Sequence, residues 1–119
     1  MQLTEDPISV KYHIQSYQPG QIVIKDQHYT KTVLISSTSV KADWGPQSIN
    51  ELSEDDINRI ASKEYEILLI GTGEQQIFLA PQLMAVAPCG IEVMTTKAAC
   101  STFNLLANEG RAVIAALFL

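Results

Sequence analysis

The fold is decided by residues 91–119, which read IEVMTTKAACSTFNLLANEGRAVIAALFL. Ile91–Met94 is a short, mainly apolar run that predicts a strand. Thr95 or Thr96 caps a helix that runs to Glu109, and Gly110 then ends the helix. Ala112–Leu119 is wholly apolar, as expected of a strand that is covered on both faces. These residues therefore predict a strand, a helix and a second strand.

The segment before residue 91 has the same organisation. Ile67–Ile70 is a continuous apolar run typical of a buried strand, and Gly71–Gly73 follows it. Pro81 opens a short helix over Gln82–Ala87. The order from residue 67 is thus strand, helix, strand, helix, strand, which predicts parallel strands joined by right-handed helical crossovers. The sequence therefore predicts an α/β fold with two crossovers in residues 67–119.

The first half of the chain predicts a different kind of structure. Alternating or apolar runs bounded by turn residues predict a small antiparallel meander. Ser53 begins a capping box that starts a helix running to about Lys63. Neither an internal repeat nor a linker is visible, so we expect residues 1–119 to form a single domain. The strands predicted outside the three strands of the two crossovers are Val10–Tyr17, Gln21–Lys25, Tyr29–Ser36 and Ile77–Leu79.

Charge is distributed unevenly along the chain. Of 8 basic and 13 acidic residues, only five lie in residues 67–119. The second half is therefore expected to be mostly buried, in its own core or against a partner. The net charge of −5 argues against nucleic-acid binding, which requires a basic patch. The longest purely apolar run, residues 112–119, is too short for a membrane span, and the acidic start resembles neither a signal nor a transit peptide. We expect a cytoplasmic, prokaryotic protein without membrane insertion.

The residues that usually carry catalysis or metal binding form no recognisable pattern. Cys89 and Cys100 are not a CxxC pair, and His13 and His28 lie far from them in sequence. We expect both cysteines to be small buried residues in a reducing compartment. No nucleophile–base motif is present. The sequence predicts no cofactor, no metal site and no catalytic residues, and an enzyme is the less favoured interpretation.

One sheet edge is the candidate ligand site. Open α/β sheets usually bind ligands at the carboxyl ends of their parallel strands. Backbone N–H groups and two hydroxyls near a helix start could hold an anion there. The alternative is a tight turn that needs glycine, because Glu74 would repel a phosphate and the dinucleotide fingerprint is incomplete. The candidate ligand residues are Gly71, Thr72, Gly73, Thr95 and Thr96.

Three other residues are candidates for contact with a partner. Trp44, beside a Gly-Pro turn, either covers the core or anchors a partner. Glu109 and Arg111 could form an ion pair across Gly110, at the end of the sheet opposite to the ligand candidates. The helix before Glu109 also carries one narrow polar stripe, and it is open whether water or another chain faces it. The stripe consists of Lys97, Ser101, Asn104 and Asn108.

The ordered motifs of residues 30–119 resemble one family, the Mth-type domain family of largely unknown function. Its branches include the mitochondrial respiratory complex I assembly factor 3 proteins and the adipogenesis-associated Mth-domain protein. Trp44 fits a tryptophan that the family often carries. Thr95 departs from the Asp expected before the family's Thr, so a role that needs a carboxylate there is not carried over. The matching motifs are Ile70–Gly73, Pro81, Gly90–Thr96, Ala98–Cys100, Thr102–Leu106, Glu109–Arg111 and Ala115–Leu117.

This resemblance implies a three-layer α/β fold with a mixed central sheet, in which one strand runs antiparallel. It brings no established catalytic activity. Two functions are expected from it and from the residues. The first is a non-catalytic interaction or assembly module with a protein partner, a homodimer being one form. The second is a small-molecule or anion-binding domain, or a weak enzyme, that uses the edge formed by Gly71–Gly73 and Thr95–Thr96.

Overall fold

The computed structural model describes residues 10–119. Its strands form two sheets, one with the order β1-β2-β3 and one with the order β5-β4-β8-β6-β7. The helices are the short 3-10 helix η1 (Ile49–Glu51), α1 (Glu54–Ile60), α2 (Pro81–Ala85) and α3 (Thr96–Asn108). The strands are β1 (Ile14–Gln18), β2 (Gln21–Ile24), β3 (Gln27–Tyr29), β4 (Val33–Ser36), β5 (Val40–Ala42), β6 (Ile67–Gly71), β7 (Gly90–Met94) and β8 (Val113–Leu117).

The five-stranded sheet is mixed. β6 lies between β7 and β8 and pairs parallel with both, in the register Leu69 to Glu92 and Leu69 to Ala115. β4 pairs antiparallel with β8 on one side and with β5 on the other. The α/β class and the two crossovers predicted for residues 67–119 are confirmed. The antiparallel strand implied by the family resemblance is confirmed as well.

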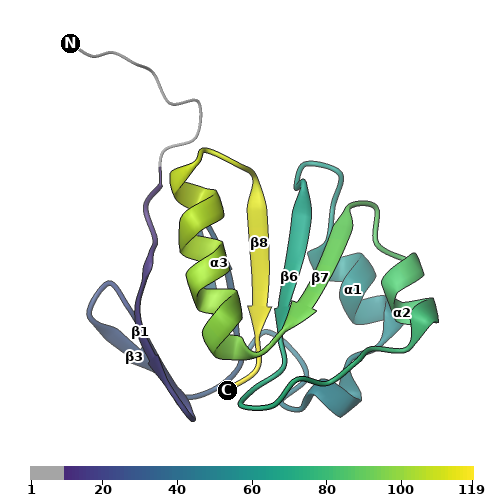
Figure 1. Ribbon diagram of the computed structural model, residues 1–119, viewed down its shortest axis with the longest axis horizontal. Coiled ribbons are helices and arrows are strands. Elements are labelled where there is room, and N and C mark those ends of the chain that lie inside the picture. Colours follow the sequence, from purple (N-terminus) through teal and green to yellow (C-terminus); the bar gives the residue numbers. More distant parts are fainter. Residues whose placement is uncertain (1–9) are drawn as a thin grey trace.

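The molecule has three layers (Figure 1). Successive residues of a strand point to opposite faces of a sheet, so Leu68 and Leu69 belong to two different cores. On the face of Leu69, α3 and the three-stranded sheet cover the five-stranded sheet. On the face of Leu68, α1 and Trp44 cover it. This double cover explains why β8 is buried along its whole length and carries no charge.

The predicted strand over Tyr29–Ser36 is wrong in its extent. The structure divides it into β3, which completes the meander, and β4, which belongs to the other sheet. No glycine or proline marks this change of sheet. The chain passes from one sheet to the other near Thr32, whose carbonyl accepts a hydrogen bond from the N–H of Asp43 at 2.7 Å. β5 was not predicted, because its three residues are too few to show a period.

Helix capping follows the sequence closely. The Ser53 hydroxyl accepts the N–H of Asp56 at 3.2 Å, while the Asp56 carboxylate accepts the N–H of Ser53 at 3.0 Å. This reciprocal capping box confirms the predicted start of α1. The Thr95 hydroxyl accepts the N–H of Ala98 at 3.3 Å and caps α3. No helix within residues 10–119 has the length and apolar character needed to cross a membrane.

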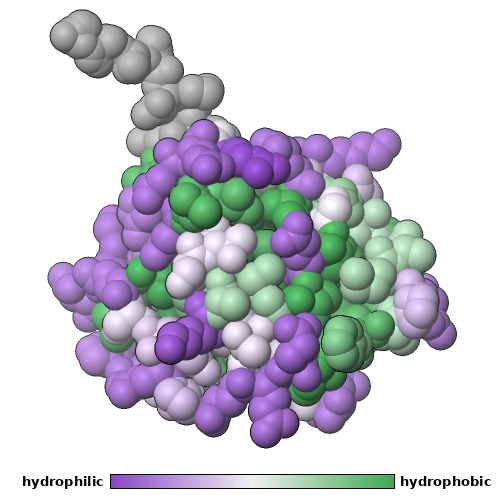
Figure 2. Space-filling model, viewed as in Figure 1, coloured by the Kyte–Doolittle hydropathy of each residue, from purple (hydrophilic) through white to green (hydrophobic). Residues whose placement is uncertain are grey.

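Burial of the second half is less complete than its composition predicts. β6, β8 and one side of α3 are buried, but no side chain of α2 is. Phe78 is 87% exposed and Met84 is 40% exposed. Figure 2 shows apolar side chains gathered on the right of this face, where Figure 1 places β7 and α2. The predicted strand over Ile77–Leu79 is also absent. The charge-free segment that contains Phe78 and α2 therefore lies at the surface and not in the core.

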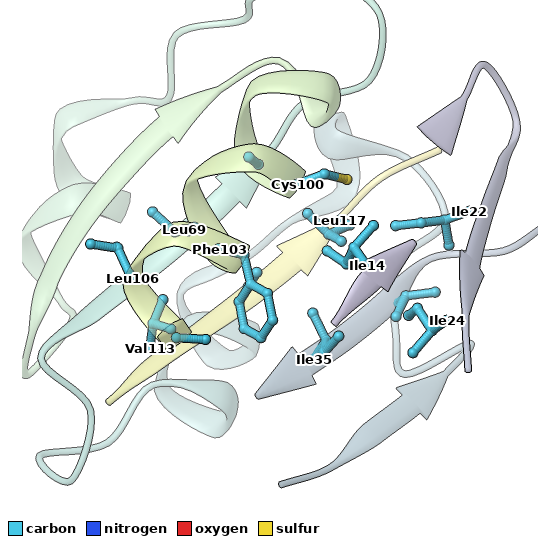
Figure 3. Close-up of a cluster of buried hydrophobic side chains, with 14 residues drawn as sticks. Ile14, Ile22, Ile24, Ile35, Leu69, Cys100, Phe103, Leu106, Val113 and Leu117 are labelled. Carbon is cyan, nitrogen blue, oxygen red and sulfur yellow. The ribbon is translucent and has the colours of Figure 1, made fainter. Parts of the chain in front are cut away.

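The larger core is organised around α3 (Figure 3). Phe103 is fully buried and points from α3 towards the strands. Ile22 and Ile24 of β2 are also fully buried and belong to the same cluster, so this core joins the small sheet to the large one. Asn104 adds a polar link, because its side chain accepts the N–H of Ile14 at 2.9 Å and donates to the Ile14 carbonyl at 2.8 Å.

Candidate functional site

The five ligand candidates come together where β6 and β7 end and α3 begins. The N–H of Thr96 donates to the Gly73 carbonyl at 2.9 Å, and the N–H of Gly73 donates to the Thr96 hydroxyl at 2.7 Å. The N–H of Thr72 donates to the Met94 carbonyl at 2.9 Å. We call the group Gly71, Thr72, Gly73, Thr95 and Thr96 the strand-end joint.

Thr96 is the centre of the strand-end joint. Its side chain is fully buried, and its hydroxyl donates to the carbonyl of Phe118 at 2.6 Å while accepting the Gly73 N–H. Gly71 lies against it so closely that a Cβ on Gly71 would be 2.9 Å from the Thr96 Cα. One hydroxyl therefore ties the ends of β6 and β8 to the start of α3, and the glycine permits that close approach.

The other polar groups of the joint are also engaged within the protein. The Thr72 hydroxyl donates to the Gln75 carbonyl at 2.5 Å, and the Thr95 hydroxyl caps α3. Gly73 has a φ of +100°, which favours glycine at this turn. These internal bonds use donors that an anion would need. The geometry therefore favours the interpretation of a tight structural turn over that of an anion cradle.

A hollow of about 360 Å³ lies beside the joint. It is lined by Tyr17, Gln18, Pro19, Gly73, Glu74, Thr95 and Lys97. The Tyr17 hydroxyl oxygen is buried and has no hydrogen-bond partner among the described residues. Burial raises the pKa of this hydroxyl, and the Glu74 and Cys100 side chains raise it further, so it is a neutral donor at physiological pH.

Trp44 is buried, with 5% of its surface exposed. Its ring packs edge-on against Phe118, with the ring centroids 6.2 Å apart. The Arg59 guanidinium lies over the indole at 5.9 Å from its centroid, and Asp56 forms an ion pair with Arg59 at 2.5 Å. Of the two interpretations of Trp44, this geometry supports a lid over the core and not a partner anchor.

The corner around Gly110 differs from its expected pairing. Arg111 does not pair with Glu109 in this structure. Its Nε donates to the Glu66 carboxylate at 3.2 Å, across the ends of β6 and β8. Glu109 and Arg111 are both exposed. The ion pair is itself largely exposed, so its contribution to stability is small.

The polar stripe of α3 is divided between side chains that bond within the protein and side chains that stay exposed. Asn104 holds the backbone of Ile14, and the Asn108 side chain lies 2.7 Å from the His13 ring nitrogen Nε2. Lys97 and Ser101 stay exposed. Half of the stripe therefore fastens β1 and the segment before it to α3. The i, i+4 spacing of the two asparagines was visible in the sequence, but their partners, the Ile14 backbone and the His13 ring, were not.

The feature that sequence reasoning missed is an apolar groove beside β7. It has a volume of about 530 Å³ and includes the most exposed aromatic side chain, Phe78. Its signal in the sequence was the charge-free stretch Gln75–Ile91, which prolines divide into pieces too short to bury their own side chains. We call it the α2 groove, and it is lined by Gln76, Phe78, Leu79, Pro81, Met84, Ala85 and Val93.

The possible metal ligands and the cysteines of the described residues lie apart from one another. Within residues 10–119, no three His, Cys, Asp or Glu side chains gather as metal ligands would. Cys89 and Cys100 are free thiols. Burial raises the pKa of the Cys100 thiol to about 12, so it stays protonated and unreactive at neutral pH. The α2 groove differs from these residues because it presents exposed apolar side chains, Phe78 above all.

Known protein families and solved structures that resemble this chain identify its family. The family described as "Protein of unknown function (DUF498/DUF598)" matches residues 14–118. The chain belongs to this family. Among solved structures, a Bordetella parapertussis protein matches with a TM-score of 0.82 and 29% identity, covering 94% of this chain and 98% of that one. A Bordetella pertussis protein described as an Mth938-like domain matches with a TM-score of 0.76, 25% identity, and coverage of 99% and 92%. The Mth-type resemblance is thus confirmed.

Two curated relatives carry different names. The mouse protein "NADH dehydrogenase [ubiquinone] 1 alpha subcomplex assembly factor 3" is 35% identical over 111 residues, which cover 88% of this chain. This match spans only 59% of the mouse protein. A Francisella tularensis protein named "13 kDa major membrane protein" is 30% identical over 121 residues and is matched over 95% of both chains. The family relation to complex I assembly factors is therefore established.

Proposed function

We propose that this protein is a non-catalytic interaction module of the assembly-factor type, and that the α2 groove is its docking surface. The observation that carries the proposal is the 87% exposure of Phe78 beside an apolar groove. An exposed aromatic residue next to a hollow is a usual anchor point of protein interfaces. The relation to assembly factors supports a protein as the partner.

The way the groove is built supports a docking role. α2 spans five residues, packs only lightly on α1 and buries none of its own side chains. Ile77 and Leu79 turn partly into the core, while Phe78 between them points outward. The residues on both sides of Phe78 are thus packed against the core. Such an anchor loses little conformational freedom when a partner binds.

A charge placed in the groove should abolish binding. We expect Phe78→Asp to cost more than about 2 kcal/mol of binding free energy, roughly a thirtyfold loss of affinity, because a hot-spot aromatic is lost and a charge is desolvated. The measurement is capture of native partners by the immobilised protein. Leu105→Asp is the matched control, since Leu105 is also exposed but lies on α3 outside the groove. Equal capture by both variants would contradict the proposal.

The second candidate function is binding of a small polar ligand in the hollow beside the strand-end joint. The unpaired Tyr17 hydroxyl favours it, with Lys97 as the nearby cation. A thermal-shift screen of nucleotides, phosphates and organic acids tests it, because a ligand at 100 times its Kd adds about 2.7 kcal/mol of stability. The shift should disappear in Tyr17→Phe. No shift with any compound at about 1 mM would count against this candidate.

We place the interaction function in the cytoplasm as part of the proposal. The free thiols of Cys89 and Cys100 support this location, because a reducing compartment keeps cysteines unpaired. Fractionation of native cells tests it. Recovery of the protein with the membranes would contradict it, and would fit the name of the Francisella relative.

A further inference from the structure

We propose that the free edge of β7 takes up an extended segment of the partner protein, in which a Lys or Arg lies between two apolar residues. This inference rests on the proposed function and names the class of partner that the α2 groove serves. It is carried by the backbone of β7, by the alternation of its side chains and by the charge of Glu92.

The outer edge of β7 is unpaired. β7 is the last strand of its sheet, and its bonds to the β6 side involve Gly90 and Met94. Alternate residues of a parallel ladder turn their N–H and C=O groups to the same side, so those of Ile91 and Val93 point outward. The Gln76 amide confirms this direction, because its Nε2 donates to the Val93 carbonyl at 3.2 Å. The exposed Gln76 side chain occupies the place where the N–H of an added strand would bind.

The side chains of β7 specify the pattern of such a strand. Ile91 and Val93 face the side of α1 and α2, and Val93 lines the α2 groove. Glu92 alternates to the opposite face, is exposed, and forms no ion pair with any residue of 10–119. Side chains of an added strand follow the same alternation. Those level with Ile91 and Val93 enter the apolar groove, and the one between them lies beside Glu92, where a cation is favoured.

A second copy of the chain fits this edge poorly. Pairing about a two-fold axis that engages Ile91 and Val93 of both copies puts Glu92 opposite Glu92 of the other copy. Like charges directly opposite each other destabilise a strand pair. The net charge of −5 on each copy adds to the repulsion. The edge therefore selects a different chain, and a basic residue in that chain gives the complementary charge.

Fluorescence anisotropy with two labelled peptides tests the proposal. The peptides share their flanking residues, and the centre of one is Ile-Lys-Val while that of the other is Ile-Glu-Val. The wild-type protein should bind the Lys peptide about fivefold more tightly, and Glu92→Lys should reverse the preference. Glu64→Lys makes the same change of charge at an exposed residue outside the α2 groove and should leave the preference intact. Gln76→Ala should tighten binding of both peptides about twofold, because no amide has to leave the edge. In the wild-type protein, amide exchange at Ile91 and Val93 should slow on binding.

Each contrary result has a separate meaning. Equal affinity for both peptides, no binding at millimolar concentration, or binding without protection of the Ile91 and Val93 amides would overturn strand addition. If Phe78→Asp still abolishes capture of native partners in that case, the interaction function stands and only the strand mode is wrong. If Phe78→Asp captures partners as well as the wild type does, the proposed function itself fails.

Discussion

Thr96→Val should lower the free energy of unfolding by about 2–5 kcal/mol, although valine has almost the same shape as threonine. The Thr96 hydroxyl donates to the Phe118 carbonyl and accepts the Gly73 N–H, and it does so with no access to water. Valine leaves the Phe118 carbonyl buried and unpaired, and the partly buried Gly73 N–H loses its partner as well. A buried group without a partner costs about 1–3 kcal/mol. Urea denaturation followed by circular dichroism measures the loss.

Thr96→Ser is the control for this prediction. Serine keeps the hydroxyl and both hydrogen bonds while it removes one methyl group, so we expect a loss of only about 1 kcal/mol. If Thr96→Val were as stable as Thr96→Ser, the hydroxyl would not hold the strand-end joint together. Its polar groups would then be available to a ligand, and the second candidate function would gain weight.

Phe103→Ala should lower the free energy of unfolding by about 3–5 kcal/mol. The Phe103 ring is fully buried between α3 and the strands, in the cluster that also holds Ile22 and Ile24 of the small sheet. Its removal leaves a cavity where the layers meet, and a close-packed core relaxes only partly around it. The urea midpoint should fall while the slope of the transition stays unchanged.

Leu105→Ala provides the comparison for Phe103→Ala. Leu105 lies on the same helix and is 59% exposed, so its truncation should change stability by less than about 0.5 kcal/mol. A similar loss for the two variants would mean that the Phe103 side of α3 does not join the two sheets. The two substitutions share the helix and the new residue, so helix propensity has little influence on the comparison.

Much of the fold could be predicted because its elements carry strong local signals. Ile67–Ile70 has the apolar continuity of a buried strand, and Ser53 and Thr95 have the side chains that cap helices. Strand order could not be predicted in this way. That β4 enters the large sheet beside β8 depends on long-range pairing, and Tyr29–Ser36 contains no glycine or proline at the change of sheet.

The site residues differ in how far the sequence could place them. Gly71–Gly73 and Thr95–Thr96 were expected at one edge, and the structure brings them together there. That their hydroxyls bond to backbone groups, such as the carbonyl of Phe118, depends on tertiary contacts that no local pattern records. Phe78 was placed in a strand, in a half of the chain that was expected to be mostly buried. Its exposure follows from the shortness of α2, which cannot cover it.

The charge asymmetry of the chain has two origins in the structure. Double cover of β6 and β8 accounts for the absence of charges there. The charge-free segment Gln75–Ile91 has a different basis, because its side chains line an exposed apolar groove beside an open strand edge. Low charge thus indicates burial within the core in one region. In the segment Gln75–Ile91, low charge instead supports contact with a partner.

The central claim, that the α2 groove is where a partner docks, is tested most directly by site-specific photo-crosslinking in native cells. A photoreactive phenylalanine analogue at the position of Phe78 should yield a discrete crosslinked species. The same analogue at the position of Leu105, which is also exposed, should yield none. Crosslinking at Leu105 without crosslinking at Phe78, or at neither position, would contradict the account.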